Sequence, residues 1–189
     1  MSLTNPPKPL AASLQSLWLR GALFVSAGGV VGSLYLSLEM ELKACPLCLY
    51  QRAFIMATAA ILGFGLFMRG VPSAALTPLA LASATAGACV AAFHLYLDVT
   101  EILECPAGVT GRITAPGESF IMYLLVLTLL LGDLFSQRTY VTHGFGAMLV
   151  GFVFAVTSIR ATPPPATPPG PYTTELDGCR KVYRVPMAK

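Results

Sequence analysis

Two cysteines separated by two residues, Cys45 and Cys48, are the group in this chain best suited to redox chemistry. A dithiol at C-x-x-C spacing can close into a disulfide, and a nearby positive charge or helix N-terminus favours its thiolate form. Arg52 follows one turn later. If a helix begins near Cys45, the three side chains share one helical face, and both the helix N-terminus and the guanidinium favour a Cys48 thiolate. The sequence therefore predicts a reactive dithiol at the start of a helix.

Two further cysteines are candidates for the same chemistry. Cys105 lies in a segment rich in turn-forming residues, Glu-Cys-Pro-Ala-Gly, and Cys179 lies close to the C-terminus. Cys105 has three readings: a disulfide with Cys179, transient mixed disulfides with Cys45 or a partner, or an unpaired structural thiol. Cys89 stands among small residues and is expected to pack as a small hydrophobic side chain.

The composition places this chemistry in a membrane protein. Hydrophobic residues make up 55% of the chain and charged residues 11%, where a soluble domain carries about 25%; the mean hydropathy is +0.69. Residues 21–38, 53–68, 71–97 and 139–159 contain no charged residue, and residues 119–137 contain only Asp133. Such runs can cross a hydrocarbon core of about 30 Å. They predict an all-α membrane protein, a bundle of four core transmembrane helices plus a fifth.

The chain divides into four parts on this reading. An N-terminal arm spans residues 1–17, a four-helix unit spans 18–137, the fifth helix spans 138–160, and a tail spans 161–189. The tail begins with a proline-rich spacer, which is expected to be extended and semi-rigid. The net charge of +3, without a basic patch interleaved with aromatic residues, gives no indication of nucleic acid as a partner. Lipid is the expected surroundings.

The distribution of positive charge predicts the orientation. Lys8, Arg20, Arg69 and Arg138 fall on one side of the predicted helices, which the positive-inside rule makes cytoplasmic. The segments with Cys45, Cys48 and Cys105 then face the exterior. Helix parity places the tail outside too, where Cys179 can reach Cys105. The basic residues of the tail argue for the opposite side, where Cys179 would be a reduced cytosolic thiol and Cys105 would lack a partner.

A longer string around the dithiol resembles a known family. Cys45-Pro-Leu-Cys48-Leu-Tyr-Gln-Arg52, between the first and second predicted spans, is similar to the C-x-x-C, aromatic, Gln or Glu, Arg pattern of the bacterial DsbB family, and His94 late in the third span is a second match. The resemblance covers roughly residues 18–137. It implies an inner-membrane oxidoreductase that faces the periplasm, reoxidises a soluble thioredoxin-like dithiol oxidase (DsbA-like) and passes the electrons to a quinone, either ubiquinone or menaquinone.

The resemblance also implies roles for individual residues. The catalytic cysteines would be Cys45, Cys48, Cys105 and Cys179, and the quinone-binding residues would be Arg52, His94 and Gln51. Members of the family carry two cysteines in the second external loop, whereas this chain has one, so Cys179 would supply the missing sulfur. Each quinone-binding candidate also has a simpler reading: Arg52 as a residue snorkelling to the headgroups, Gln51 as an interfacial amide and His94 as an interfacial polar residue.

Two other functions remain compatible with the sequence. A vitamin K epoxide reductase-like enzyme also couples a membrane dithiol to a quinone, but that family carries its C-x-x-C in the fourth helix. A non-catalytic membrane scaffold would use the C-x-x-C as a structural disulfide and bind no quinone. A metal site is not expected, because the spacing supplies neither a second C-x-x-C nor a Cys/His pair.

Overall fold

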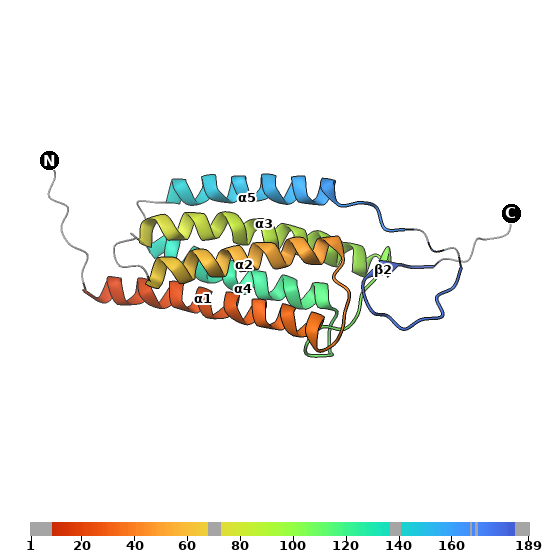
Figure 1. Ribbon diagram of the computed structural model, residues 1–189. Helices are drawn as coiled ribbons and strands as arrows, with labels where there is room; N and C mark the ends of the chain where they lie inside the picture. Colours follow the sequence, from red (N-terminus) through yellow and green to blue (C-terminus); the bar gives the residue numbers. More distant parts are fainter. Residues whose placement is uncertain (1–8, 68–72, 137–140, 167, 169, 184–189) are drawn as a thin grey trace.

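The computed structural model describes residues 9–67, 73–136, 141–166, 168 and 170–183 (Figure 1). Within these ranges the chain forms the helices α1 (Pro9–Leu38), α2 (Pro46–Phe67), α3 (Ser73–Val99), α4 (Ala115–Ser136) and α5 (Val141–Ala161). All five are long and apolar enough to cross a membrane, which confirms the predicted all-α class. Because Pro at a first turn and the Leu-Ala-Ala run after it favour helix, α1 begins at Pro9, inside the predicted arm.

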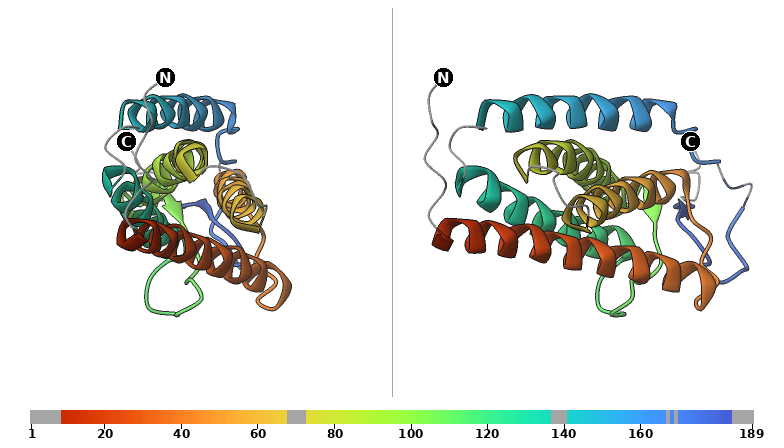
Figure 2. Two further views of the ribbon diagram at one scale, coloured as in Figure 1. Left: turned by 90° about the vertical axis from the view of Figure 1, so that its left-hand side faces the viewer. Right: turned by 60° about the vertical axis from the view of Figure 1, so that its left-hand side comes forward.

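Helix α3 lies at the centre of the bundle. It packs against α2, α4 and α5, while α1 packs against α2 and α4 and α5 covers an outer face (Figure 2). The arrangement confirms four core helices with a fifth added to them. Gly87 of α3 lets the buried ring of Tyr123 on α4 approach closely, since a Cβ at this position would lie 2.1 Å from the Tyr123 Cζ atom. The contact fixes α4 against the part of α3 that precedes His94.

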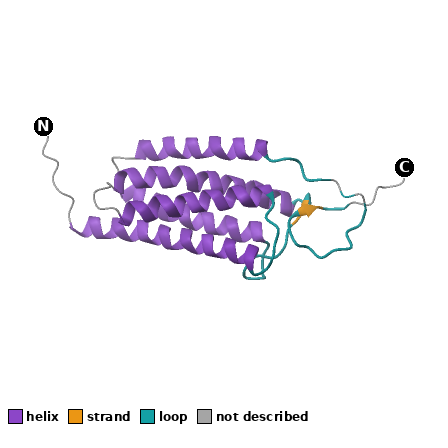
Figure 3. Cartoon of the chain, in the orientation of Figure 1, coloured by secondary structure: helices purple, strands orange, loops and turns teal. Residues whose placement is uncertain are grey.

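The segments that carry the reactive cysteines meet at one end of the bundle. The α1–α2 loop, the α3–α4 loop and the tail after α5 all lie there (Figure 3). The tail is therefore on the same side as the loop cysteines, as helix parity predicted, and the alternative placement of Cys179 as a separate thiol at the opposite end is wrong. Among the residues used to predict orientation, Lys8, Arg69 and Arg138 lie outside the described residues.

A two-stranded sheet ties the tail to the α3–α4 loop. Strands β1 (Leu103–Glu104) and β2 (Arg180–Lys181) pair antiparallel, with Leu103 opposite Lys181 and Glu104 opposite Arg180. One further step in this register sets Cys105 opposite Cys179, and their Cα atoms are 4.2 Å apart. The sheet thus aligns the two cysteines.

The tail also contacts the α1–α2 loop. Lys43 forms a parallel bridge with Gly178, and its backbone N–H donates to the Asp177 carbonyl at 2.6 Å. The Lys43 Nζ atom lies 2.6 Å from an Asp177 carboxylate oxygen, in an exposed ion pair. The tail therefore lies between the two loops and carries Cys179 toward the start of α2.

Candidate thiol redox site

The start of α2 builds the first cysteine pair. Cys45 immediately precedes the helix and Pro46 occupies its first position, where a missing N–H costs nothing. The Cys48 backbone N–H donates to the Cys45 Sγ atom at 3.2 Å, so the Cys45 sulfur caps the helix. The two Sγ atoms are 2.8 Å apart. The C-x-x-C spacing at a helix start is enough to bring these sulfurs together.

The favoured thiolate of this pair is Cys45. The hydrogen bond with the Cys48 thiol, with a smaller contribution from His94, lowers the pKa of Cys45 to about 5. The sequence predicted the thiolate on Cys48 instead. The expectation is wrong because the capping geometry aims the helix N-terminus at the Cys45 sulfur, and the Arg52 guanidinium is engaged by α1. Negative charge in this pair therefore rests on the sulfur nearer His94.

The second pair is the disulfide between Cys105 and Cys179. It confirms the predicted pairing, and the reading of Cys105 as an unpaired structural thiol is wrong. Cys105 is buried, with 7% of its surface exposed, whereas Cys179 is half-buried and lies on the surface of two cavities. Of the two sulfurs, Cys179 is the accessible one.

His94 lies between the two pairs. Its side chain is fully buried, so the interfacial reading is wrong. The Nε2 atom is 3.4 Å from the Cys105 Sγ and 3.8 Å from the Cys45 Sγ. The Nδ1 atom is 3.1 Å from the Gln51 side-chain nitrogen, and Gln51 is itself buried. The imidazole thus connects the two sulfur pairs on one edge and the second helix on the other.

The sulfurs and the imidazole form one compact cluster. One ligand-type atom each from Cys45, Cys48, His94 and Cys179 lies within 4.8 Å of the others. Sequence spacing did not reveal this Cys/His grouping, because the four residues come from three separate segments. The spacing suits a soft metal ion, but the Cys179 sulfur is bonded to Cys105. In this structure the cluster is a thiol and disulfide centre.

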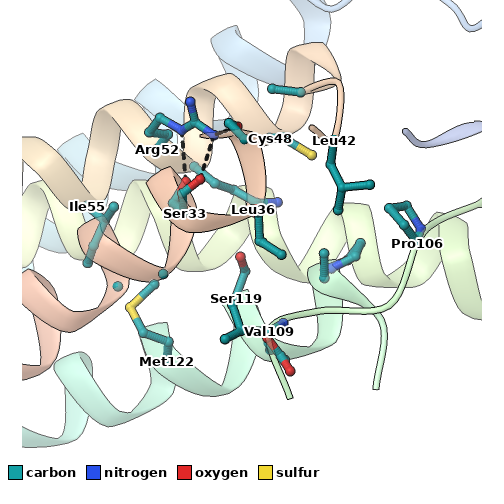
Figure 4. A pocket seen from close by; sticks show the side chains of 18 of the residues that line it. Ser33, Leu36, Leu42, Cys48, Arg52, Ile55, Pro106, Val109, Ser119 and Met122 are labelled. Atoms are coloured by element: carbon teal, nitrogen blue, oxygen red, sulfur yellow. Dashed lines mark hydrogen bonds between the residues drawn. The ribbon is translucent and has the colours of Figure 1, made fainter. Parts of the chain in front are cut away.

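A cavity of about 360 Å³, here called the Arg52 cavity, adjoins Cys48 between α1, α2 and α4 (Figure 4). Its lining includes Gly28, Gly32, Cys48, Gln51, Arg52 and Cys179. The cavity surface is mostly apolar, with a few polar groups among its lining residues. Such a combination is typical of small-molecule sites.

Arg52 is held at this cavity by the first helix. Its Nε atom donates to the Ser33 Oγ at 2.8 Å (Figure 4). Its Nη2 atom donates to the Ser33 carbonyl at 2.9 Å and to the Ser37 Oγ at 2.5 Å. These bonds fix the guanidinium beside Cys48 instead of extending it to the headgroups. The contacts with α1 argue against the snorkelling reading.

Three supporting residues were missed by the sequence analysis. Ser33 and Ser37 anchor Arg52, and the Tyr123 hydroxyl donates to the Gln51 carbonyl at 2.5 Å. The two serines stand one helical turn apart near the end of an uncharged span, a signal that could have been recognised. Tyr123 gives no such signal, because its partner comes from another helix.

A second cavity of about 500 Å³, the tail cavity, also borders Cys179. It is bordered by the ends of α3 and α5 and by the tail, and its lining includes Cys45, Cys179 and Arg180. The Arg180 guanidinium stacks 4.0 Å from the centre of the Tyr172 ring and also pairs with Glu104. Cys179 is thus reachable from two directions.

Comparison with protein families gives one match over most of the helical region. Residues 15–120 match the family described as "Disulfide bond formation protein DsbB". The matched segment contains Cys45, Cys48, His94 and Cys105 and ends before Cys179.

Individual relatives carry related names. The chain is 30% identical over 98 residues to "Probable disulfide formation protein C 1" of Bacillus anthracis, which covers 52% of this chain and 66% of that protein. It is 29% identical over 106 residues to a Bacillus cereus protein of similar name, covering 56% and 70%. It is 32% identical over 98 residues to "Disulfide bond formation protein B 2" of Burkholderia lata, covering 51% and 58%. No solved structure matches the chain.

Proposed function

This chain belongs to the DsbB family of disulfide bond formation proteins, and on that premise we propose that it couples oxidation of an external dithiol protein to reduction of a membrane quinone. The supporting observation is the joining of two sulfur pairs at one wall of the Arg52 cavity. Two sulfurs line it: Cys179 of the Cys105–Cys179 disulfide, here called the outer pair, and Cys48 of the Cys45–Cys48 dithiol, the inner pair. The protein substrate would be a thioredoxin-like dithiol oxidase on the periplasmic side of a bacterial inner membrane.

Electrons enter at the Cys105–Cys179 disulfide in this proposal. A substrate thiolate attacks the Cys179 sulfur, because Cys179 borders the tail cavity while Cys105 is buried. A bond forms between the substrate sulfur and Cys179, and Cys105 leaves as a thiolate. The second substrate thiol then attacks the substrate sulfur of this mixed disulfide, and the bond to Cys179 breaks. The substrate is oxidised, and both Cys105 and Cys179 are left reduced.

Electrons leave through the Cys45–Cys48 pair. In its oxidised form this disulfide accepts two electrons from the reduced outer pair by a second exchange, because the Cys179 and Cys45 sulfurs are within 4.8 Å. A dithiol is thereby formed at Cys45 and Cys48, with Cys48 on the wall of the Arg52 cavity.

The residues of the Arg52 cavity fit a quinone ring. Gly28 leaves open space in the wall, since nothing lies within 4 Å of where its Cβ would be. Arg52 uses Nε and Nη2 to hold α1, which leaves Nη1 for a ring oxygen. A bound quinone would supply the two-electron acceptor, and the fixed guanidinium would favour negative charge beside Cys48. Gln51 lines the same cavity.

We leave His94 out of the quinone-binding candidates of this proposal. The described residues that line the Arg52 cavity include Gln51 but not His94. The other two functions are also less well supported: the position of the C-x-x-C before the second helix argues against the vitamin K epoxide reductase-like order, and a scaffold does not need two adjoining sulfur pairs.

Purified protein in lipid nanodiscs tests the proposal. Reduced thioredoxin serves as the dithiol and a water-soluble short-chain quinone as the acceptor, with quinone absorbance as the readout. We expect thioredoxin-dependent quinone reduction that is lost in Cys48→Ser and retained in Cys89→Ser. Full turnover in both Cys45→Ala and Arg52→Ala would contradict the mechanism, and wild-type protein that reduces no quinone would support the scaffold.

A further inference from the structure

His94 is a buried polar side chain that the proposed electron path does not yet use. It is fully buried in α3, yet the sulfurs of Cys45 and Cys105 both lie against its Nε2 edge. A histidine that served only to pack the bundle would not need this position. A quinone contact is also unsupported, since Gln51 stands between His94 and the Arg52 cavity.

Gln51 determines which ring nitrogen carries the proton. The Gln51 side-chain nitrogen, which can only donate, lies 3.1 Å from the His94 Nδ1 atom. Nδ1 must therefore accept, and in the neutral ring the hydrogen is on Nε2. The Tyr123 hydroxyl holds the Gln51 backbone carbonyl from α4 and so supports this residue. The Nε2–H group is consequently directed toward the sulfur cluster.

The Nε2 atom faces the two sulfurs that must exchange a common partner. It is 3.4 Å from the Cys105 Sγ and 3.8 Å from the Cys45 Sγ. Both are within reach of Cys179, which is bonded to the first and within 4.8 Å of the second. Cys179 is thus the central sulfur of the exchange, and Cys45 and Cys105 are its two alternative partners.

We propose that His94 donates a hydrogen bond from Nε2 to Cys105 and to Cys45 while the disulfide bond of Cys179 moves from one of these cysteines to the other. Cys179 is the sulfur that changes partner. The inference rests on the proposed function, because it assigns a residue to the internal transfer step of that reaction. It moves His94 from the quinone site to the thiol site.

The chemistry of the transfer balances in two steps. First, the Cys179 thiolate attacks the Cys45 sulfur of the Cys45–Cys48 disulfide, and Cys48 leaves as a thiolate. Then the Cys105 thiolate attacks Cys179, the Cys179–Cys45 bond breaks, and its electron pair goes to Cys45. Two electrons have moved from the outer pair to the inner pair. In the second step the attacking and leaving sulfurs are the two that His94 contacts.

In a thiol–disulfide exchange, negative charge accumulates on the attacking and leaving sulfurs, which here are Cys105 and Cys45. One hydrogen-bond donor can therefore serve both. His94 need not transfer its proton, because one thiolate is consumed as the other forms. The structure has the arrangement expected after the transfer: Cys105 and Cys179 are bonded, and Cys45 and Cys48 are free. The lowered pKa of Cys45 agrees with a thiolate on the leaving sulfur.

The transfer can be measured on the purified full-length protein. Fully oxidised protein without added quinone is mixed with reduced thioredoxin, quenched with acid at intervals and labelled with a thiol reagent. Peptide mass analysis then follows labelling of Cys105 and of Cys45 separately. The delay between the labelling of Cys105 and the labelling of Cys45 gives the rate of the internal transfer.

Three substitutions of His94 separate a donor from a packing role. His94→Phe fills a similar volume without a donor, His94→Gln places an amide nitrogen near the Nε2 position, and His94→Asn places one near the Nδ1 position. We expect His94→Phe to slow the transfer by about 10- to 100-fold, the value of a charge-assisted hydrogen bond. We expect His94→Gln to be the fastest of the three. Phe equal to wild type, or Asn faster than Gln, would overturn the proposal.

Gln51→Leu tests the positioning role of the amide. Loss of the Nδ1 contact should slow the transfer in a wild-type background and have less than about a twofold effect in a His94→Gln background, because an amide at position 94 has no tautomer to fix. Equal effects in both backgrounds would show that Gln51 acts only structurally and would contradict the proposed orientation of His94.

Two controls keep the outcomes distinct. Formation of the Cys105–Cys179 disulfide, read by non-reducing peptide mapping, reports folding of each variant, and if His94→Phe fails this check the order of Gln and Asn decides. Wild-type protein that transfers electrons to Cys45 but reduces no quinone would contradict the proposed function alone. Quinone reduction in wild type with unchanged transfer in His94→Phe would contradict only the role of His94.

Discussion

The two cysteine pairs of this protein are built in opposite ways. Cys45 and Cys48 are brought together by one helix start, through a cap and a backbone hydrogen bond. Cys105 and Cys179 are 74 residues apart and meet through the register of a two-residue sheet between a loop and the tail. The inner pair is thus fixed to the bundle, whereas the outer pair depends on a tail that follows α5. This difference suits the proposed electron path, in which the Cys45–Cys48 pair is a fixed outlet beside a cavity and the Cys105–Cys179 pair is an accessible inlet for a protein substrate.

The largest expected effect comes from removing the tail sulfur. Cys179→Ser should lower thioredoxin-dependent quinone reduction by more than about 10³-fold, because Cys105 then has no partner. Dithiothreitol, which is small enough to reach the inner pair, should bypass the defect. The steady-state rate with each reductant measures this, and Cys89→Ser is the matched control. Equal loss with both reductants would mean that Cys179 does not act specifically as the inlet.

Arg52 tests the outlet. Arg52→Ala should raise the KM for a soluble quinone by about 10- to 100-fold. The KM of Arg52→Lys should lie between those of wild type and Arg52→Ala, because Lys cannot keep the forked contacts to Ser33 and Ser37. Steady-state kinetics at saturating thioredoxin provide the measurement. Arg112→Ala removes an exposed loop arginine and should change KM by less than about twofold. If Arg52→Ala changed only the KM for thioredoxin, Arg52 would act at the Cys105–Cys179 pair and not at the quinone side, which would contradict its assignment.

Acid titration tests the local geometry of the inner pair. In the reduced protein, alkylation of Cys45 should be half-maximal near pH 5, because that is where the pKa of Cys45 lies. Cys48→Ala should raise the midpoint most, since the bond with Cys48 is the largest cause of the lowering. The pKa of Cys45 is below its ordinary value of 9.0, so its thiolate stabilises the reduced fold above about pH 9, and this contribution is lost as the pH falls toward 5. A midpoint near 9 would contradict the capped thiolate.

The smallest effect is expected at the exposed tie between the tail and the first loop. Lys43→Ala removes the ion pair with Asp177 but leaves the backbone contacts of the same residue. Re-formation of the Cys105–Cys179 disulfide after reduction should slow by less than about twofold, because exposed ion pairs contribute little. Quenched labelling of Cys105 measures the rate. Slowing by more than about tenfold would mean that charge, rather than the sheet register, places the tail.

The contrast between the pairs also explains what could be predicted from the sequence. The five helices follow from long uncharged runs, and the Cys45–Cys48 pair follows from spacing. The position of the thiolate was predicted incorrectly, because it depends on which sulfur accepts the Cys48 N–H, a detail that spacing does not encode. His94 and Cys179 could be named as candidates, but their meeting depends on packing between α2, α3 and the tail.

The central claim is that Cys179 connects the two pairs, and cross-linking tests it most directly. In a Cys48→Ser, Cys105→Ser double variant, Cys45 and Cys179 are the remaining cysteines of the cluster. After mild oxidation in membranes, non-reducing peptide mapping should find a Cys45–Cys179 disulfide as the main product, because the two sulfurs lie within 4.8 Å in the native arrangement. Free thiols at both positions, or links only between separate chains, would contradict the account.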